Sequence, residues 1–587
     1  MKSLVAFFFL FFSFVFSNAS FAKTWKVPVL YWSMKIEGQV AMRKGFEEEI
    51  SLFNKKGKDK VELISYVAGE GRKGILNQVS QLDEALKKSP QALVIQPTDN
   101  SALARGLQEA NGAGVPVFAY DQYIVNGQLT SFATSDNYTG GKDNGEYIDS
   151  LYDKDHEIRI VVFEYPKVSS TTERVDGFFD ALRKRNRKFK VLKRYEAVDP
   201  ESGEKAVKAF LKNFPVKGSV DVIFTVNDGG GLTIVKRLLE KKRNEILHAT
   251  FDGDPQSIEN IKNKRLTVID SAQFCAELGR EIARSLVAYL GKEPVPEKKL
   301  VPTYPVTEKN INAYPGWMGR PVQKVATTSA VGANKELKNL REPSDIKERG
   351  FLNIRIGVAP LCPYLCEKGP GVWGGYIYDI LTAVAKLHGF TVELESIPNT
   401  RLVSALQAQR VNYIIGPRYM VRYLPDVRVV GPNLGVSYTG ALLSPGLREP
   451  LIDNEFVRNK KVVFADLGSE SGNSLSIDYS ARAIKLTGSD VADRMTKMIS
   501  DRRVDLALGD YNVLRYSLLR RAHVPLQLLP TSLTGFNSLV LVSNPKEPEF
   551  GFLPQHLDAW FEKARTSNEL DKILSRYNLK DWKVFNR

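Results

Sequence analysis

The sequence has little cysteine and histidine, and it lacks the common catalytic signatures. Its 587 residues include 3 Cys and 5 His, whereas a zinc site usually takes four ligands of the Cys and His type. It contains no nucleophile elbow, no Walker-type phosphate loop and no HExxH motif, and the Gly229-Gly-Gly run lacks the Rossmann spacing. We therefore predict a protein that is not an enzyme and that holds no metal or cofactor.

Long hydrophobic runs are absent after the amino terminus. Met1-Lys2 precedes an apolar block from Leu4 to Phe16, and Ser20-Phe-Ala22 has the small-x-small pattern of a cleavage site. Residues 1–22 are therefore predicted to be a secretory signal peptide, with an uncleaved membrane anchor as the alternative. The block is short for a membrane span, which favours cleavage and an exported, soluble protein.

The charge is far from balanced, with a formal net value of +15. Basic proteins often bind nucleic acid or anionic membranes, but export argues against a nucleic-acid partner. The densest basic run, Arg183-Lys-Arg-Asn-Arg-Lys188, falls at the end of a predicted helix. Cations are favourable there, so a solvated helix end is the preferred interpretation over a membrane-binding patch.

The chain is too long for one hydrophobic core, and its periodicity divides it into parts. From Val27 to about Val301, short apolar strands alternate with amphipathic helices, which predicts doubly wound parallel sheets in two lobes. Periodicity stops in the Pro-, Gly- and charge-rich residues 314–350, and a second α/β series starts at Leu352. We expect an α/β protein of two bilobal domains, residues 23–313 and 351–587, each lobe being a mainly parallel sheet.

Polar side chains follow three of the predicted strands in the first domain. Asp121 ends the apolar run that starts at Val115, while Asn227 and Asp252 follow two later strands. In open α/β sheets, ligands lie beyond the carboxyl ends of the strands. Carboxylates and amides can hold hydroxyl groups in fixed directions. The alternative for each of these residues is a helix cap.

The first domain resembles the ribose-binding type of periplasmic solute-binding proteins from Trp25 to about Tyr304. The resemblance is carried by short motifs around five polar residues: Gly112-Ala-Gly-Val-Pro-Val before Asp121, Glu173-Arg174-Val-Asp-Gly, Val226-Asn227-Asp, Phe251-Asp252-Gly and Ser271-Ala-Gln273. It implies that Asp121, Arg174, Asn227, Asp252 and Gln273 bind sugar hydroxyls. It departs at Tyr31-Trp32-Ser-Met, where Trp32 is either an aromatic wall for the ligand or a core residue.

The second domain resembles the family 3 solute-binding proteins, which bind amino acids, from Asn353 to about Asp581. The similarity includes Gly375-Tyr-Ile-Tyr-Asp379, Gly468-Ser469 and Val504-Asp-Leu-Ala-Leu-Gly-Asp510. It implies an arginine clamp for a carboxylate at Arg422, with Arg418 as the rival, supported by Ser469. Asp510 would bind an ammonium group. Alternatively, Arg422 and Asp510 are surface or capping residues.

Two of the three cysteines lie close together, at Cys362 and Cys366 in a Pro-containing loop. In an oxidising compartment these residues could form a small disulfide. Cys275 lies on an apolar helix face and is expected to be a buried free thiol.

These features together predict a periplasmic, non-catalytic receptor with two clefts in tandem. It would bind a sugar or polyol in the first domain and an amino acid or small anion in the second, each by hinge closure. The expected partners are membrane transporter subunits, or the periplasmic face of a sensor kinase or chemoreceptor. The alternatives are a periplasmic hydrolase that uses one cleft, with Asp121 and Asp252 as its acid–base pair, and a scaffold with inactive clefts.

Overall fold

The computed structural model describes residues 22–324, 353–465, 483–486, 488, 490–520, 525–545 and 551–582. The predicted signal peptide, except for Ala22, and most of the predicted linker lie outside these residues, as does Ser469. None of the helices in the described ranges has both the length and the apolar character of a membrane span.

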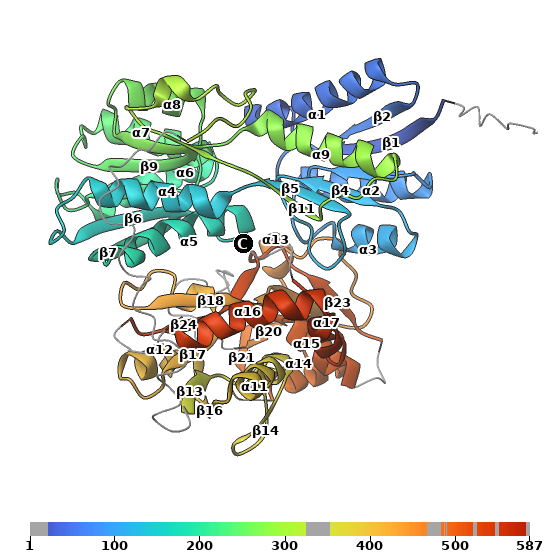
Figure 1. Ribbon diagram of the computed structural model, residues 1–587, viewed down its shortest axis with the longest axis vertical. Coiled ribbons are helices and arrows are strands. Elements are labelled where there is room, and N and C mark those ends of the chain that lie inside the picture. The colour runs from blue at the N-terminus through green and yellow to red at the C-terminus, as the bar shows by residue number, and fades with distance from the viewer. Residues whose placement is uncertain are drawn as a thin grey trace, which may run out of the picture.

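The amino-terminal half consists of two lobes, each built on one six-stranded sheet (Figure 1). Lobe I has the strand order β11-β5-β4-β3-β1-β2, and its elements are β1 (Thr24–Tyr31), α1 (Glu37–Lys56), β2 (Lys60–Val67), α2 (Gly71–Lys87), β3 (Leu93–Ile95), α3 (Ala104–Gly112), β4 (Val117–Tyr120), β5 (Ser131–Ser135), α9 (Cys275–Leu290) and β11 (Lys298–Val301). Lobe II has the order β12-β10-β9-β8-β6-β7, and its elements are α4 (Asn137–Ser150), β6 (Ile158–Glu164), α5 (Ser169–Lys184), β7 (Phe189–Glu196), α6 (Pro200–Asn213), β8 (Val222–Thr225), α7 (Asp228–Glu240), β9 (Leu247–Asp252), α8 (Pro255–Lys262), β10 (Thr267–Ala272) and β12 (Tyr304–Val306).

The predicted parallel sheets of this half are confirmed. Every strand pair in lobe I is parallel, and in lobe II only the short β12 is antiparallel to its neighbour β10. Central strands such as β4 and β8 are buried along their whole length, because helices cover both faces of each sheet. The chain crosses between the lobes after β5, after β10 and between β11 and β12.

The carboxy-terminal half also has two lobes, each with a five-stranded sheet. Lobe III has the order β16-β13-β17-β24-β18, and its elements are β13 (Asn353–Val358), the hairpin β14 (Cys366–Gly369) and β15 (Val372–Gly374), α11 (Tyr376–His388), β16 (Thr391–Ser396), α12 (Asn399–Gln407), β17 (Tyr413–Pro417), β18 (Arg428–Ser437), β24 (Asn537–Ser543), α16 (Phe552–Thr566) and α17 (Glu569–Ser575). Lobe IV has the order β21-β20-β22-β19-β23, and its elements are β19 (Thr439–Leu443), α13 (Asn454–Val457), β20 (Val462–Ala465), β21 (Ala483–Leu486), α14 (Val491–Ser500), β22 (Leu506–Asp510), α15 (Tyr511–Arg520) and β23 (Gln527–Pro530).

The sheets of the carboxy-terminal half are mixed, so the prediction of mainly parallel sheets is wrong there. In lobe III, β24 runs antiparallel to both β17 and β18, and in lobe IV, β19 runs antiparallel to both β22 and β23. A parallel neighbour needs a crossover that turns the chain round. Strands β24 and β19 enter their sheets directly from the other lobe, so they run against their neighbours.

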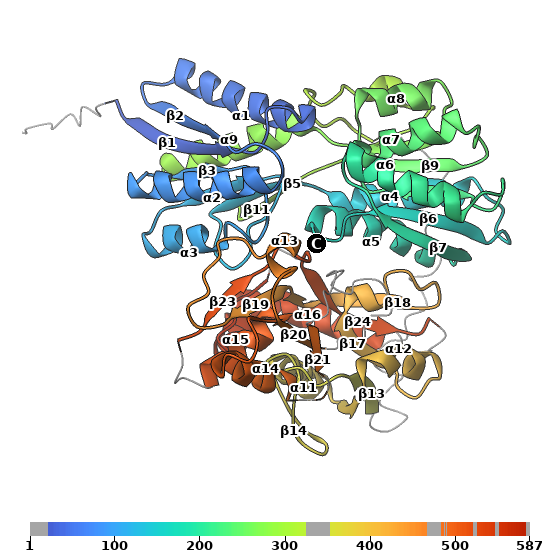
Figure 2. The same ribbon diagram turned by 180° about the vertical axis from the view of Figure 1, so that it is seen from behind.

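The two halves lie against each other lobe to lobe, with lobe I beside lobe IV and lobe II beside lobe III (Figures 1 and 2). Between lobes I and IV, Arg72 Nε lies 2.8 Å from Asp453 Oδ2. Between lobes II and III, Asp176 of α5 forms ion pairs with Arg422 at 2.6 Å and with Arg418 at 2.9 Å. Asp176 is 5% exposed and both arginines are 2% exposed, so this charged contact is buried.

We predict that Arg422→Met lowers the free energy of unfolding by about 3–5 kcal/mol, because it leaves the buried Asp176 charge with one cation fewer. The exposed Arg401 provides the matched control, and Arg401→Met should change the free energy by less than about 0.5 kcal/mol. Urea unfolding of both variants, of Asp176→Asn and of Arg422→Met combined with Asp176→Asn measures the coupling between Arg422 and Asp176. Equal stability of the two single variants would contradict a buried ionic contact between the lobes.

Candidate ligand-binding site

Four of the five residues that the resemblance singles out in the amino-terminal half meet between lobes I and II. Asp121 directly follows β4 of lobe I, Arg174 lies in the second turn of α5, Asp252 ends β9, and Gln273 follows β10. We call Asp121, Arg174, Asp252 and Gln273 the polar cluster. Because the strands are parallel, their carboxyl ends bring these side chains to the same edge of each sheet.

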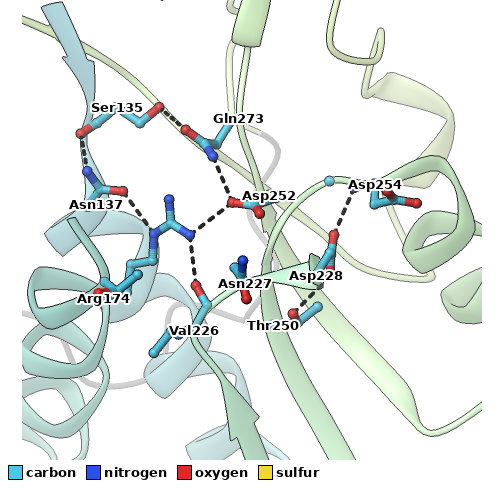
Figure 3. A network of polar contacts seen from close by, with 12 residues as sticks. Ser135, Asn137, Arg174, Val226, Asn227, Asp228, Thr250, Asp252, Asp254 and Gln273 are labelled. Carbon is cyan, nitrogen blue, oxygen red and sulfur yellow. Dashed lines mark hydrogen bonds and ion pairs between the residues drawn. The ribbon is translucent and has the colours of Figure 1, made fainter. Parts of the chain in front are cut away.

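Arg174 is the centre of this cluster (Figure 3). Its Nη1 lies 2.9 Å from Asp252 Oδ1 and donates to the Val226 carbonyl oxygen at 2.7 Å. Its Nε donates to Asn137 Oδ1 at 2.9 Å, and its guanidinium carbon lies 3.8 Å from the centre of the Phe251 ring. The side chain is only 5% exposed, so the guanidinium is held rigidly by charge, hydrogen bonds and a cation–π contact.

Gln273 joins the cluster to the crossings between the lobes. Its Nε2 donates to Asp252 Oδ1 at 2.7 Å, and its Oε1 accepts from Ser135 Oγ at 2.7 Å (Figure 3). Ser135 ends β5 and Gln273 follows β10, and the chain passes from one lobe to the other after each of these strands. The cluster is therefore tied to the segments about which the two lobes would rotate.

Burial raises the pKa of both carboxyl groups of the cluster. Burial, as the largest cause, and the charge of Asp252 raise the pKa of Asp121 to about 7, and Arg174 acts against this shift. Burial also raises the pKa of Asp252, while Arg174 and Gln273 lower it. In the described part of the chain, the Asp121 carboxylate accepts no hydrogen bond.

The backbone at both acidic residues adopts conformations that L-residues rarely take. Asp121 has φ +70° and Asp252 has φ +122°, outside the regions that side chains normally allow. The turn after β9 is held by two further carboxylates: Asp270 Oδ1 accepts from Gly253 N at 2.9 Å, and Asp228 Oδ2 accepts from Asp254 N at 2.8 Å. Strain that the surroundings maintain in this way is typical of functional sites.

Asn227 lies beside the cluster (Figure 3), but both ends of its amide already have protein partners. Its Oδ1 accepts from Gly230 N at 3.3 Å as the N-cap of α7, and its Nδ2 donates to the Val198 carbonyl oxygen at 2.8 Å. In this structure Asn227 therefore acts as a helix cap, as the alternative interpretation of the sequence predicted. Trp32 follows β1 and is half-buried. The ligand-binding roles of both residues stay predictions.

The start of the predicted linker packs against this site. Tyr314 OH donates to the Gln273 carbonyl oxygen at 2.7 Å, and Trp317 Nε1 donates to the Asp252 carbonyl oxygen at 2.8 Å. Tyr314 and Trp317 therefore hold the backbone of two residues of the polar cluster. Sequence reasoning missed this support and also Asp270. The available signals were two aromatic residues in a Pro- and Gly-rich segment and a carboxylate within the apolar run of β10.

Comparison with known proteins identifies the amino-terminal half. Residues 27–294 match the family model described as periplasmic binding protein domain. The ribose import binding protein RbsB of Bacillus subtilis (strain 168) is 26% identical over 251 residues, which are 42% of this chain and 77% of that protein. RbsB of Escherichia coli (strain K12) is 26% identical over 233 residues, 40% of this chain and 75% of that protein. This half is therefore similar to the ribose-binding type of periplasmic binding domain, and we call it the ribose-binding-type domain.

Among solved structures, a solute-binding protein from Bacillus halodurans C-125 with bound myo-inositol covers 51% of this chain and 99% of its own, with 19% sequence identity and a TM-score of 0.45. The family match of the ribose-binding-type domain ends at residue 294. The assignment of the carboxy-terminal half to the solute-binding proteins therefore stays a prediction.

The carboxy-terminal half has a cavity of about 290 Å³, lined by residues of both lobes III and IV. Tyr364, Tyr419 and Asp510 contribute to its wall. Asp510 accepts hydrogen bonds from Ser437 Oγ at 2.6 Å, Tyr364 OH at 3.0 Å and Val513 N at 2.9 Å. Burial raises the pKa of Asp510 to about 6, although these hydrogen bonds lower it. The predicted ligand residue Asp510 thus lies at a cavity.

The structure does not place Arg422, or its rival Arg418, on the wall of this cavity, where the predicted clamp for a ligand carboxylate would lie. Their ligand-binding role stays a prediction. Arg422 pairs with Asp176, and Arg418 pairs with Asp176 and Asp180, all across the contact between lobes II and III. The physical reason is the acidic face of α5, which offers both guanidinium groups buried partners that sequence reasoning within the second domain alone could not supply.

Two smaller predictions can also be placed. The structure joins Cys362 and Cys366 by a disulfide in the loop before β14, and Cys275 is a buried free cysteine at the start of α9. The described residues contain no group of three or more His, Cys, Asp or Glu side chains that could hold a metal ion.

We predict that Asp121→Asn stabilises the protein above pH 7 and has little effect near pH 4. A carboxyl group whose pKa rises on folding binds more protons in the folded state, so its contribution to the free energy of unfolding falls as pH rises from about 4 to about 7. Asn cannot titrate and tolerates the same backbone region. The gain at pH 8 should be about 2–4 kcal/mol.

Thermal or urea unfolding at both pH values measures this difference, with Asp155→Asn, at an exposed position, as the control. A variant that tracks the wild type at pH 4 and pH 8 alike would show that Asp121 is an ordinary ionised carboxylate.

Proposed function

We propose that the protein is an exported, non-catalytic receptor that binds a sugar or polyol between lobes I and II. The observation that carries the proposal is the polar cluster, in which a buried carboxylate and a buried guanidinium keep groups available at the junction of the lobes. Asp121 accepts no hydrogen bond from the described residues, and the contacts of Arg174 with those residues use its Nε and Nη1. Sugar hydroxyls both donate and accept, which suits this pair.

Closure of the lobes follows from where the cluster residues come from. Asp121 belongs to lobe I, while Arg174 and Asp252 belong to lobe II. A ligand that contacts all three gains its full binding energy only when the lobes are together, so it shifts the population towards the closed state. The contacts of Arg174 and the strained turns at Asp121 and Asp252 hold the binding groups in place before the ligand arrives. This preorganisation lowers the entropic cost of binding.

The relatives support the sugar as the ligand class, since both matched proteins are named ribose import binding proteins. The predicted signal peptide supports the periplasm as the compartment. Readout would use a membrane transporter subunit, or the periplasmic face of a sensor kinase or chemoreceptor, and we favour sensing because two fused clefts serve one transporter poorly.

For the cavity between lobes III and IV, we propose a small polar ligand that carries an amino or hydroxyl group. Asp510 is the buried carboxylate on the cavity wall, and Lys485 is the cation on that wall. Arg422 and Arg418 pair with Asp176 across the lobe contact, so an amino-acid carboxylate would have to be bound by other groups of the cavity wall. Tyrosine rings at Tyr364 and Tyr419 provide apolar faces with polar tips for a small ring or chain.

The proposal predicts that D-ribose or another pentose, hexose or polyol binds the full-length protein, measured by calorimetry and by a rise in melting temperature. Asp121→Asn should weaken that binding by about 10- to 100-fold, because a hydrogen bond to a charged acceptor is worth about 1.5–3 kcal/mol. Asp155→Asn should bind like the wild type. Absence of binding across the panel, or tight binding that survives Asp121→Asn, would refute a sugar site at the polar cluster.

A further inference from the structure

The connections between lobes III and IV lie on the amino-terminal half. In the described ranges, Tyr438 joins β18 to β19, and residues 531–536 join β23 to β24. These two connections carry the chain from one lobe to the other, so any rotation of lobe III against lobe IV changes their backbone angles. We call residues 531–536 the hinge segment.

The hinge segment contacts both lobes of the ribose-binding-type domain. Ser532 Oγ donates to Asp99 Oδ1 of lobe I at 2.8 Å. Only three positions later, Gly535 N donates to the Pro166 carbonyl oxygen of lobe II at 3.0 Å. Asp99 lies in the loop after β3 and Pro166 in the loop after β6, so both partners lie at carboxyl ends of strands, one in each lobe. The hinge segment therefore bridges lobes I and II.

Aromatic packing extends this contact to the loop that carries Asp121. Tyr123, two residues after Asp121, packs edge-on against Phe536 of the hinge segment with ring centroids 6.5 Å apart. Asn126 of the same loop donates to Tyr511 OH at 2.7 Å, and Tyr511 stacks on Tyr438 with centroids 5.0 Å apart. A shift of the Asp121 loop on ligand binding is thus passed directly to both connections between lobes III and IV.

Away from the hinge segment, each amino-terminal lobe is fixed to a different carboxy-terminal lobe. Lobe II is held to lobe III by the buried Asp176–Arg422 pair and by Arg183, whose Nη1 donates to the Arg422 carbonyl oxygen at 2.9 Å. Lobe I is held to lobe IV by the Arg72–Asp453 pair. If lobes I and II rotate, lobes III and IV must rotate with them, or one of these contacts must break.

The hinge segment also forms part of the second cavity. Thr534 and Gly535 line it, and so do the flanking Tyr438 and Asn537. One stretch of backbone thus contacts both lobes I and II and also lines the second cavity. A ligand on either side favours the hinge-segment geometry that suits it, which is the physical requirement for coupling between two sites.

We propose that the carboxy-terminal half reads closure of the ribose-binding-type domain through the hinge segment, so that the two clefts are allosterically coupled. Binding between lobes I and II changes the conformation and affinity of the second cavity, and by linkage a ligand there changes sugar affinity by the same factor. The ligand-driven part of this inference rests on the proposed sugar binding, whereas the mechanical bridge itself does not.

Hydrogen exchange of the full-length protein tests the inference, with D-ribose as the probe. In the wild type, saturating D-ribose should slow exchange in residues 531–536 and in β18 and β24 by about 5-fold or more. Gly535→Ala removes the bridge, since a Cβ there would lie 2.7 Å from the Pro166 carbonyl oxygen and 3.0 Å from the Lys167 carbonyl carbon. This variant should still bind D-ribose but lose the protection. Ser532→Ala should reduce it in the same direction.

Gly369→Ala is the matched control, because a Cβ at Gly369 meets no atom within 4 Å, and it should behave like the wild type. Protection confined to the amino-terminal half on D-ribose binding would overturn the coupling while leaving the receptor function intact. Failure of D-ribose to bind would count against the proposed function only. The bridge is then tested without ligand: Gly535→Ala should speed exchange in residues 97–100, 165–168 and 531–536 together, and unchanged exchange there would overturn it.

Discussion

The buried contact between Asp176 and the two arginines Arg418 and Arg422 is the constraint on which the arrangement of the molecule depends. Asp176 lies two positions after Arg174 on α5, which places the two side chains about 200° apart around the helix. One face of α5 therefore supplies the guanidinium of the polar cluster, and the opposite face supplies the anion that anchors lobe III. A single helix links the first binding site to the second half of the chain.

Loops at the carboxyl ends of strands in lobes I and II likewise contact the carboxy-terminal half of the chain. The loop after β4 carries Asp121 into the cluster and Tyr123 and Asn126 onto the carboxy-terminal half. The loops after β3 and β6 hold the hinge segment from both sides. The second half of the chain thus covers loops that belong to both lobes of the first half. This placement favours a receptor in which the carboxy-terminal half of the same chain responds to closure of lobes I and II.

Much of the first site could be predicted from the sequence because its residues sit at fixed places in a regular pattern. Asp121 and Asp252 follow apolar strands, and the ends of parallel strands meet at one edge. Other features depend on contacts between distant segments. The apolar strands of the carboxy-terminal half do not show which neighbour each will pair with, so its mixed sheets were not foreseen. Short elements such as β11, β12 and α13 carry too few residues for a periodic signal.

Arg422 shows most clearly what the sequence alone cannot predict. An arginine after a strand and before Gly431-Pro432 fits a ligand clamp by position, but its partner is decided by the acidic face of a helix some 250 residues earlier, as the Asp176 pairing shows. Asn227 is the milder case, since capping and ligand binding ask for the same residue type at the same place.

The most direct test of the central claim, that closure of lobes I and II is coupled to rotation of lobe III against lobe IV, is a pair of distances measured by pulsed electron paramagnetic resonance. One pair of spin labels spans lobes I and II, and the other spans lobes III and IV, each on exposed helix positions of the full-length protein. Our account predicts that D-ribose shifts both distance distributions together. A shift between lobes I and II with no change between lobes III and IV would contradict it.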